Sequence, residues 1–333
     1  MSYSDDFIRQ LALNWAPINY QYINLRGWKD YYYTKQDLLV PVNLEYYKCN
    51  EKDKEKSYDT QNMRKRLECV KIDALTPAAY YSFAATKNHF YLLYSFYHAD
   101  DTGHPNDMEG CLVILERSDS KQKLLGMVTI AHGKRPKYSF NNNLFLNNGK
   151  QSKVDPMFVE DEGQNKHPII QQESGKHGLY GLGYPWKLTQ IWRWLKNIFG
   201  FKSDIIVYFP YKPAKPYCIT DLIRFKGTTH YATFYYDLID ILKDPDDEKN
   251  KGFFHRRVGE GNKNNTFMEN EKFYGNAANP PWLWEYTDIK LWDDPALLAE
   301  KWFVPSKGCK PFRDEQSSSK KINYERRMDG KTL

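Results

Sequence analysis

The sequence lacks the cysteine pairs of a disulfide framework or of a thiolate zinc site. Its five cysteines are odd in number and far apart, and no C-x-x-C motif occurs. Long apolar runs are missing too, because the longest, FYLLYSFY at 90–97, has eight residues, whereas a membrane-spanning helix needs about 20. We therefore expect no transmembrane segment, and cysteines that are mostly small buried side chains.

Blocks of like charge and known nucleotide-binding loops are also absent. The formal net charge is +6, and the lysines are interspersed with acids, so we expect no nucleic acid partner. The glycines of ESGKHGLYGLG (173–183) fit neither the P-loop nor the dinucleotide-binding spacing. GxSxG is missing, and no local motif supplies a covalent nucleophile.

The first residues are not expected to act as a signal peptide. MSYSDDFIRQLALNWAP carries acids where a signal peptide carries bases, and its apolar positions are interrupted. This pattern predicts cytoplasmic synthesis of a soluble protein. Export by a dedicated secretion machine stays open, and so does the oligomeric state.

Aromatic residues are abundant, and many lie in short runs typical of β-strands. The chain holds 26 Tyr, 18 Phe and 9 Trp. Strands are predicted at 79–85, 89–97, 111–117, 123–132, 167–172 and 204–210. Most follow one another too closely for crossover helices, so they favour antiparallel pairing. The predicted fold class is mainly β, an antiparallel β-sandwich with a few peripheral helices.

Two helices are predicted beside the strands. WKLTQIWRWLKNIFG (186–200) has a helical apolar stripe, which packs on the sheet or binds a membrane or partner. A second helix is predicted at 231–242. The length of 333 residues accommodates a single domain over 1–312, and the charged, serine-rich residues 313–333 are expected to form a flexible tail.

The segment YSFYHADDTGHPNDMEG (94–110) joins an aromatic strand to an acidic turn. Asp107 and Glu109 stand two residues apart where the next strand begins, so their side chains project from the same face. Asp101 ends the preceding segment and His104 lies in the turn. If the two strands are neighbours, all four side chains converge at one end of the sheet.

Carboxylates that converge in this way repel one another. At about 4 Å and an effective dielectric constant of about 20, each pair costs about 4 kcal/mol. The charges are solvated apart in an ordinary acidic turn, protonated, paired with Lys or Arg, or held by a cation. For the last case we predict a divalent-metal site of Asp101, His104, Asp107 and Glu109, which suits Mg, Ca or Mn better than Zn.

The chain resembles two protein families through separate segments. YSFYHADDTGHPNDMEG, the opening LALNWAPINY and the late NPPWLWEYTD are similar to segments of the vacuolar protein sorting-associated protein 62 family. The similar segments lie between about residue 10 and residue 295, and the similarity between them is not continuous. It bears on the fold more than on the function.

A more distant resemblance is to the necrosis- and ethylene-inducing peptide 1-like toxins, whose signature is G-H-R-H-D-W-E after an aromatic strand that ends in aspartate. Gly103, His104, Asp107 and Glu109 match the signature, and Asp101 falls where that aspartate would be. The resemblance implies a divalent ion on a β-sandwich. In those toxins the ion helps to recognise a sphingolipid head group.

Two histidines extend the second resemblance. AHGKRPKY, with His132, is similar to the toxins' AHGGY, and HPIIQQESGKHGLY, with His177, is similar to their H-P…D-G-x-x-H region. The signature's Arg-His is replaced by Pro105 and Asn106, and its Trp by Met108. The surface next to any ion is therefore changed.

Three functions follow from these observations. The first is a metal-binding recognition protein, a toxin or effector, whose partner is an anionic lipid head group or a carbohydrate. The second is a metal-dependent hydrolase of an ester or phosphoester, with His177 or His132 as general acid or base. The third is a structural sandwich with a stabilising ion.

Overall fold

The computed structural model describes fifteen segments of the chain, which make up a β-rich molecule. They are residues 3–24, 32–41, 67–102, 105–118, 122–132, 134–147, 158–160, 166–181, 203–210, 214–217, 231–240, 285–286, 289–290, 295–313 and 325–327. Segment 186–200, where a helix is predicted, lies outside the described residues.

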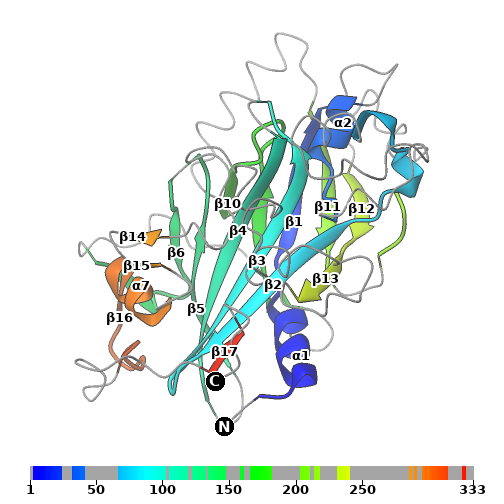
Figure 1. Cartoon of the computed structure of the whole chain (residues 1–333). Helices are drawn as coiled ribbons and strands as arrows, with labels where there is room; N and C mark the ends of the chain where they lie inside the picture. Colours follow the sequence, from blue (N-terminus) through cyan, green and yellow to red (C-terminus); the bar gives the residue numbers. More distant parts are fainter. Residues whose placement is uncertain are drawn as a thin grey trace, which may run out of the picture.

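Two large sheets form the molecule (Figure 1). The six-stranded sheet has the order β10-β9-β1-β11-β12, with β8 paired to β9. Its strands are β1 (Ile18–Asn24), β8 (Phe158–Glu160), β9 (Lys166–Gln172), β10 (Leu179–Gly181), β11 (Ser203–Phe209) and β12 (Tyr231–Tyr235).

The seven-stranded sheet has the order β13-β2-β3-β4-β5-β6, with β17 paired to β2. Its strands are β2 (Ala78–Ala85), β3 (His89–Asp100), β4 (Pro105–Glu116), β5 (Lys123–Thr129), β6 (Lys137–Ser139), β13 (Asp237–Asp240) and β17 (Glu325–Arg327). Two small ribbons pair β7 (Leu144–Leu146) with β16 (Phe303–Pro305), and β14 (Glu285–Tyr286) with β15 (Ile289–Lys290).

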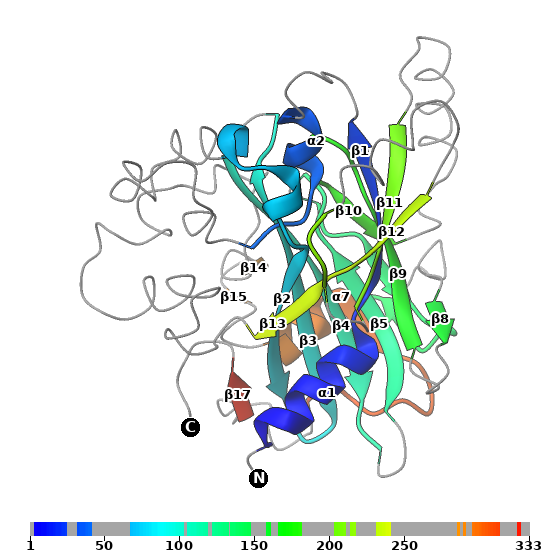
Figure 2. The ribbon, with the colours of Figure 1, turned by 90° about the vertical axis from the view of Figure 1, so that its right-hand side faces the viewer.

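The described helices are few and lie outside the sheets: α1 (Asp5–Trp15), α2 (Tyr32–Asp37), the 3-10 helix η3 (Ile72–Ala74) and α7 (Pro295–Trp302). Figures 1 and 2 show α1 and α2 at opposite ends of the strands. The Ser4 hydroxyl caps α1 by accepting from the Phe7 amide at 3.2 Å, an interaction worth about 1 kcal/mol. No helix in the described part of the chain is long and apolar enough to cross a bilayer.

The predicted fold class is confirmed, since the molecule is mainly β with two layered sheets and few helices (Figure 2). The hairpins β2–β3 and β3–β4 are antiparallel, as their short connections predict. Three pairs are parallel, however: β1 with β9, β11 with β12, and β2 with β13. Both sheets are therefore mixed. The parallel partners are far apart in sequence, which leaves room for the long connections that parallel pairing needs.

The prediction of a helix over 231–242 is wrong. Tyr231–Tyr235 forms β12 in the six-stranded sheet and Asp237–Asp240 forms β13 in the seven-stranded sheet. Tyr236 joins them, and its buried hydroxyl donates to the Pro17 carbonyl at 2.7 Å. Aromatic residues and threonine in β12 favour a pleated surface, and pairing with β11 overrides the apparent helical spacing.

The tail that was predicted to be flexible contributes one strand. Its residues Glu325–Arg327 form β17 and pair antiparallel with β2.

The described cysteines differ in their chemical state. Cys69 is disulfide-bonded, contrary to the expectation for the cysteines, whereas Cys111 and Cys309 are free thiols. Burial raises the pKa of the Cys111 thiol well above its ordinary value.

Candidate functional site

The β3–β4 hairpin places the predicted carboxylates inside the molecule. In the register of this pair, His98 lies opposite Asp107, and Phe96 lies opposite Glu109. Residues that face each other across an antiparallel pair share a face of the sheet, so Asp107, Glu109 and His98 lie together. All three side chains are fully buried, so this is not a solvated acidic turn.

Asp101 follows the last residue of β3 and is 3% exposed. Alternation along β3 places Asp100, rather than Asp101, on the face of His98. The Gln36 amide donates to Asp100 Oδ2 at 2.6 Å and to the Asp101 carbonyl at 3.4 Å. The structure thus adds Asp100 to the buried acids of this turn, and the predicted ligand His104 lies outside the described residues.

A second loop reaches the same place from the six-stranded sheet. It connects β9 to β10, and its Gly175 carbonyl accepts from the Thr102 amide at 2.8 Å. His177 of this loop is fully buried and adopts a left-handed backbone conformation, with φ of 52°. Non-glycine residues in this conformation are uncommon and are enriched at functional sites.

His177 bridges two carboxylates. Its Nδ1 donates to Asp107 Oδ2 at 2.7 Å, and its Nε2 donates to Asp37 Oδ1 at 3.2 Å. Asp37, at the end of α2, also accepts from the Gly175 amide at 2.6 Å. Ionised carboxylates only accept hydrogen bonds, so this geometry matches an imidazole protonated on both nitrogens and held by Asp37 and Asp107.

The pKa of His177 agrees with this geometry. Burial lowers the pKa, but the hydrogen bonds and charges of Asp107 and Asp37 outweigh burial and raise it to about 10. His177 therefore carries a positive charge at neutral pH. Part of the predicted repulsion between carboxylates is thus relieved by an imidazolium, where the sequence suggested Lys, Arg or a metal ion.

His98 is the neutral neighbour of this charged ring. The two imidazoles stack with centroids 3.8 Å apart and an interplanar angle of 10°. Burial, and then the charge of His177, lower the pKa of His98 well below its ordinary value. Its Nδ1 donates to the Leu38 carbonyl at 3.1 Å, which fixes the tautomer of the neutral ring.

His132 and Glu173 form a partly exposed pair at the rim of this site. His132 Nε2 lies 2.6 Å from Glu173 Oε2, and the side chains are 37% and 39% exposed. The hydrogen bond to Glu173 raises the pKa of His132 against the effect of burial, and the charge of Asp107 raises it further. His132 is also left-handed, with φ of 50°.

Gly178 lies beneath the rim pair. A Cβ atom at Gly178 would lie 2.9 Å from His132 Nε2 and 3.0 Å from Glu173 Oε2. Because Gly178 has no side chain, His132 and Glu173 can pack directly against the backbone of the loop that carries His177. The sequence indicated both histidines, but it gave no signal for Asp37 or Glu173, whose partners lie 140 and 41 residues away.

The metal prediction is not tested by this geometry. In the part of the chain that the structure describes, no three His, Cys, Asp or Glu side chains form a group that could hold a metal ion. Asp107 and Glu109 nevertheless supply the oxygen donors that hard divalent ions prefer. His104, the predicted nitrogen ligand, is not among the residues described.

These features define a mainly β sandwich with a carboxylate–imidazolium site buried at one end. No protein-family model and no curated protein matches the chain. Solved structures with partial similarity of fold are necrosis- and ethylene-inducing proteins. The resemblance to the vacuolar protein sorting-associated protein 62 family finds no support in these comparisons.

Three of these structures give the extent of the similarity. NLPPya in complex with glucosamine is 19% identical, over 32% of this chain and 44% of that one, with a TM-score of 0.23. Necrosis and Ethylene inducing Protein 2, from the causal agent of witches' broom disease of cocoa, is 23% identical over 32% and 45%, with a TM-score of 0.23. A triple mutant of NLPPya is 17% identical over 54% and 70%, with a TM-score of 0.30. The chain spans less than half the length of the first two.

Proposed function

We propose that this chain is a divalent-metal-dependent recognition protein, a toxin or effector, that binds an anionic lipid head group or a glycan. The observation that carries the proposal is the burial of five carboxylates at one end of the sandwich: Asp37, Asp100, Asp101, Asp107 and Glu109. Buried carboxylates are retained where they hold a cation or another charged partner. A site that binds a cation for ligand recognition would explain why these carboxylates are gathered at one end of the sandwich.

Asp107 and Glu109 would hold the ion, together with Asp101 and His104. Asp107 and Glu109 project from the same face of β4, and carboxylate oxygens suit Mg, Ca or Mn. His177 supports the set because its Nδ1 fixes the orientation of the Asp107 carboxylate. When bound, the ion would supply positive charge to the oxygen atoms of a ligand.

Hydrolysis of an ester or phosphoester is the second candidate, and the His132–Glu173 pair favours it. A half-exposed imidazole oriented by a carboxylate is the usual arrangement of a general base. His177 is less suited to that role, since its raised pKa keeps it protonated at neutral pH. A panel of chromogenic esters and phosphodiesters, with Asp107→Ala as the inactive reference, tests this candidate.

Elemental analysis and calorimetric titration with calcium, magnesium and manganese test the ion directly. We expect one ion per chain, and for Glu109→Gln an affinity lower by at least about tenfold, since a ligand is lost. Glu116→Gln is the matched control, because Glu116 lies at the other end of β4 and accepts from the Lys310 amide at 2.6 Å. A wild-type protein that holds none of the three ions would refute the proposal.

Ligand binding separates recognition from a purely structural ion. Glycan arrays, including the amino sugars glucosamine and mannosamine, and lipid vesicles are probed with and without a chelator. We expect binding that the chelator abolishes. An ion that raises the thermal stability of the protein, while no glycan or head group binds, would favour the structural sandwich.

A further inference from the structure

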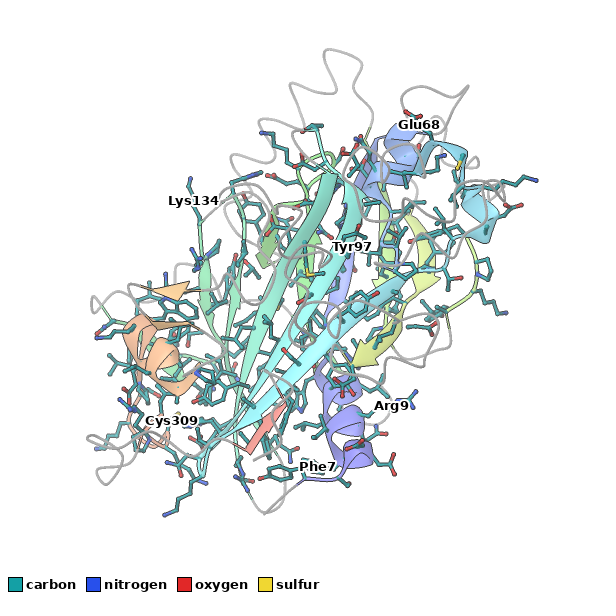
Figure 3. The ribbon with its side chains drawn as sticks, in the orientation of Figure 1. Phe7, Arg9, Glu68, Tyr97, Lys134 and Cys309 are labelled. Atoms are coloured by element: carbon teal, nitrogen blue, oxygen red, sulfur yellow. The ribbon has the colours of Figure 1, made fainter. Side chains whose placement is uncertain are left out.

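A strap of residues 306–313 follows β16 and crosses the end of the seven-stranded sheet at which β3 begins. Figure 3 shows Cys309 of this strap and Glu68, which lies beside α2, at opposite ends of the strands. The strap is therefore remote from the carboxylate site, which lies at the α2 end. Among the residues of the strap, which the structure describes throughout, only Phe312 is buried. One aromatic ring thus anchors an otherwise exposed or half-buried segment.

Polar contacts hold the strap to the strands beneath it. The Lys310 amide donates to Glu116 Oε2 at 2.6 Å, where β4 ends, and the Lys310 ammonium donates to the Arg117 carbonyl at 2.5 Å. The Asn88 side-chain amide, in the β2–β3 turn, donates to the Pro311 carbonyl at 3.1 Å. These contacts lie at a half-buried or exposed rim, where water can replace them at a small net cost. The apolar contact beneath the strap therefore decides how firmly it is held.

That contact is made with a titratable side chain. Phe312 packs on His89, the first residue of β3, with the ring centres 5.0 Å apart, and the imidazole is fully buried. Among the residues that the structure describes, neither nitrogen of His89 has a hydrogen-bond partner. The neutral ring packs there as an aromatic side chain, whereas an imidazolium would bury a charge and two N–H groups without acceptors.

Cations outnumber acids on the elements that meet around His89. The cations are Lys310 and Arg313 of the strap, Lys87 of the β2–β3 turn, Arg117 after β4 and Lys123 of β5. Of the acids, Glu300 pairs with Arg313 at 4.0 Å, and Glu116, opposite His89 in the β3–β4 pair, accepts from the Lys310 amide. Burial, and then the charge of Lys310, lower the pKa of His89 to about 3. A closed strap therefore disfavours a proton on His89.

We propose that the strap is acid-sensitive: protonation of His89 displaces Phe312 and opens residues 306–313 while the two sheets stay folded. Opening admits water to the imidazolium and moves the Lys310 ammonium away from it. The open strap exposes the Phe312 ring, so acid adds an aromatic side chain to the surface at the end of the molecule opposite the carboxylate site. The proposal is independent of the ion and of the ligand proposed above.

The linkage between the proton and the strap sets the size of the effect. An open strap returns His89 to its ordinary pKa of about 6.5, whereas closure lowers the pKa to about 3. Closure is therefore most favourable above about pH 6.5 and weakens as the pH falls towards 3. Between pH 7.5 and pH 5 the equilibrium constant for opening should rise up to about thirtyfold.

Hydrogen exchange at pH 7.5 and pH 5, read by mass spectrometry and corrected for the intrinsic exchange rate, tests the strap. We expect the protection of the peptide that carries the Lys310 amide to fall at least about tenfold at pH 5, while β3 and β4 stay protected. His89→Phe keeps the aromatic contact without a titrating group and should keep the strap protected at both pH values. Glu116→Gln is the matched control, because it removes the neighbouring titrating group but keeps an oxygen that can accept from the Lys310 amide, so it should respond as the wild type does.

Phe312→Ala opens the strap without acid. It removes the buried anchor, so protection of the strap should be low at both pH values. Unchanged protection in this variant would overturn the proposal, as would equal protection of the wild-type strap at the two pH values. A pH response that His89→Phe retains, or that Glu116→Gln abolishes, would assign the effect to other groups and overturn it too. Loss of protection in β3 and β4 together with the strap would show acid unfolding of the sheet instead.

Discussion

His177 joins three parts of the chain through one ring. Its two N–H groups hold Asp37 and Asp107, its face stacks on His98, and its loop is tied to α2 through the Gly175 amide. An imidazolium between two buried carboxylates is costly to assemble, and removing one partner leaves charge uncompensated. The site and the stability of this end of the sandwich therefore depend on the same contacts.

Asp37→Asn should destabilise the protein by about 3 kcal/mol, the lower end of the range for breaking a buried ion pair. The pKa of His177 should fall because one of the two charges that raise it is removed. Urea denaturation gives the stability, and the imidazole resonances give the pKa. Asp73→Asn, at an exposed aspartate, is the control, and an equal loss in both variants would contradict the prediction.

His89 makes the opposite kind of contribution at the other end of β3. Among the residues that the structure describes, neither ring nitrogen has a hydrogen-bond partner, and the ring centre lies 5.0 Å from that of Phe312. Burial, and then the charge of Lys310, lower the pKa of His89 to about 3. Glu116 lies opposite His89 in the β3–β4 pair. Because of its lowered pKa, His89 is neutral in the folded protein at neutral pH.

The stability that depends on neutral His89 is complete above its unfolded pKa of about 6.5 and is lost as the pH falls towards 3. Between pH 7.5 and pH 5 the loss should be about 2 kcal/mol, since only the unfolded chain binds the proton. His89→Phe keeps the aromatic contact and should remove this part of the pH dependence. Denaturation at both pH values measures it, and an unchanged dependence in the variant would be evidence against it.

The strands that carry the site were predictable, and their partners were not. Strands β2 to β5 follow from aromatic and β-branched runs with short polar turns, and their register confirms that Asp107 and Glu109 share a face. The segment 231–242 was misread because sheet pairing, which sequence spacing does not record, decided its conformation. Asp37 could not be found, since only the packing of α2 brings it to His177.

Two glycines test how tightly these elements fit. A Cβ at Gly126 of β5 would lie 2.9 Å from the Tyr138 carbonyl oxygen and 2.5 Å from Leu144 Cδ1, so backbone has to move. Gly126→Ala should therefore destabilise the protein by about 1–3 kcal/mol. At Gly178 the nearest atoms are the ends of two side chains, so Gly178→Ala should cost less than about 1 kcal/mol.

Gly178→Ala should instead displace His132 from Glu173, and the pKa of His132 should fall because that hydrogen bond raises it. Thermal denaturation and imidazole titration of both variants measure the two effects. The prediction fails if Gly178→Ala is the more destabilising substitution, or if the pKa of His132 is the same as in the wild type.

The molecule as a whole separates its charges by depth at one end. The acids come from α2 and from the seven-stranded sheet, the imidazolium comes from a loop of the six-stranded sheet, and the exposed Lys134 and Lys176 stand on the turn after β5 and on the β9–β10 loop. The net charge of +6 does not indicate this arrangement of buried acids and exposed lysines. Composition predicts no nucleic-acid partner, while the order of buried and exposed charge became visible only with the two sheets packed.

The cysteines offer a test that involves the entire chain. Alkylation of the folded protein should label Cys309, which is partly exposed beside the Lys123 ammonium at 3.3 Å, and spare Cys111, which is buried and has a raised pKa. Cys69 should be labelled only after reduction, since it is disulfide-bonded. Peptide mass spectrometry under reducing and non-reducing conditions reads out each thiol. Labelling of Cys69 without reductant would contradict the disulfide, whereas its protection in protein from the native source would favour an oxidising compartment, and hence export, over the cytosol.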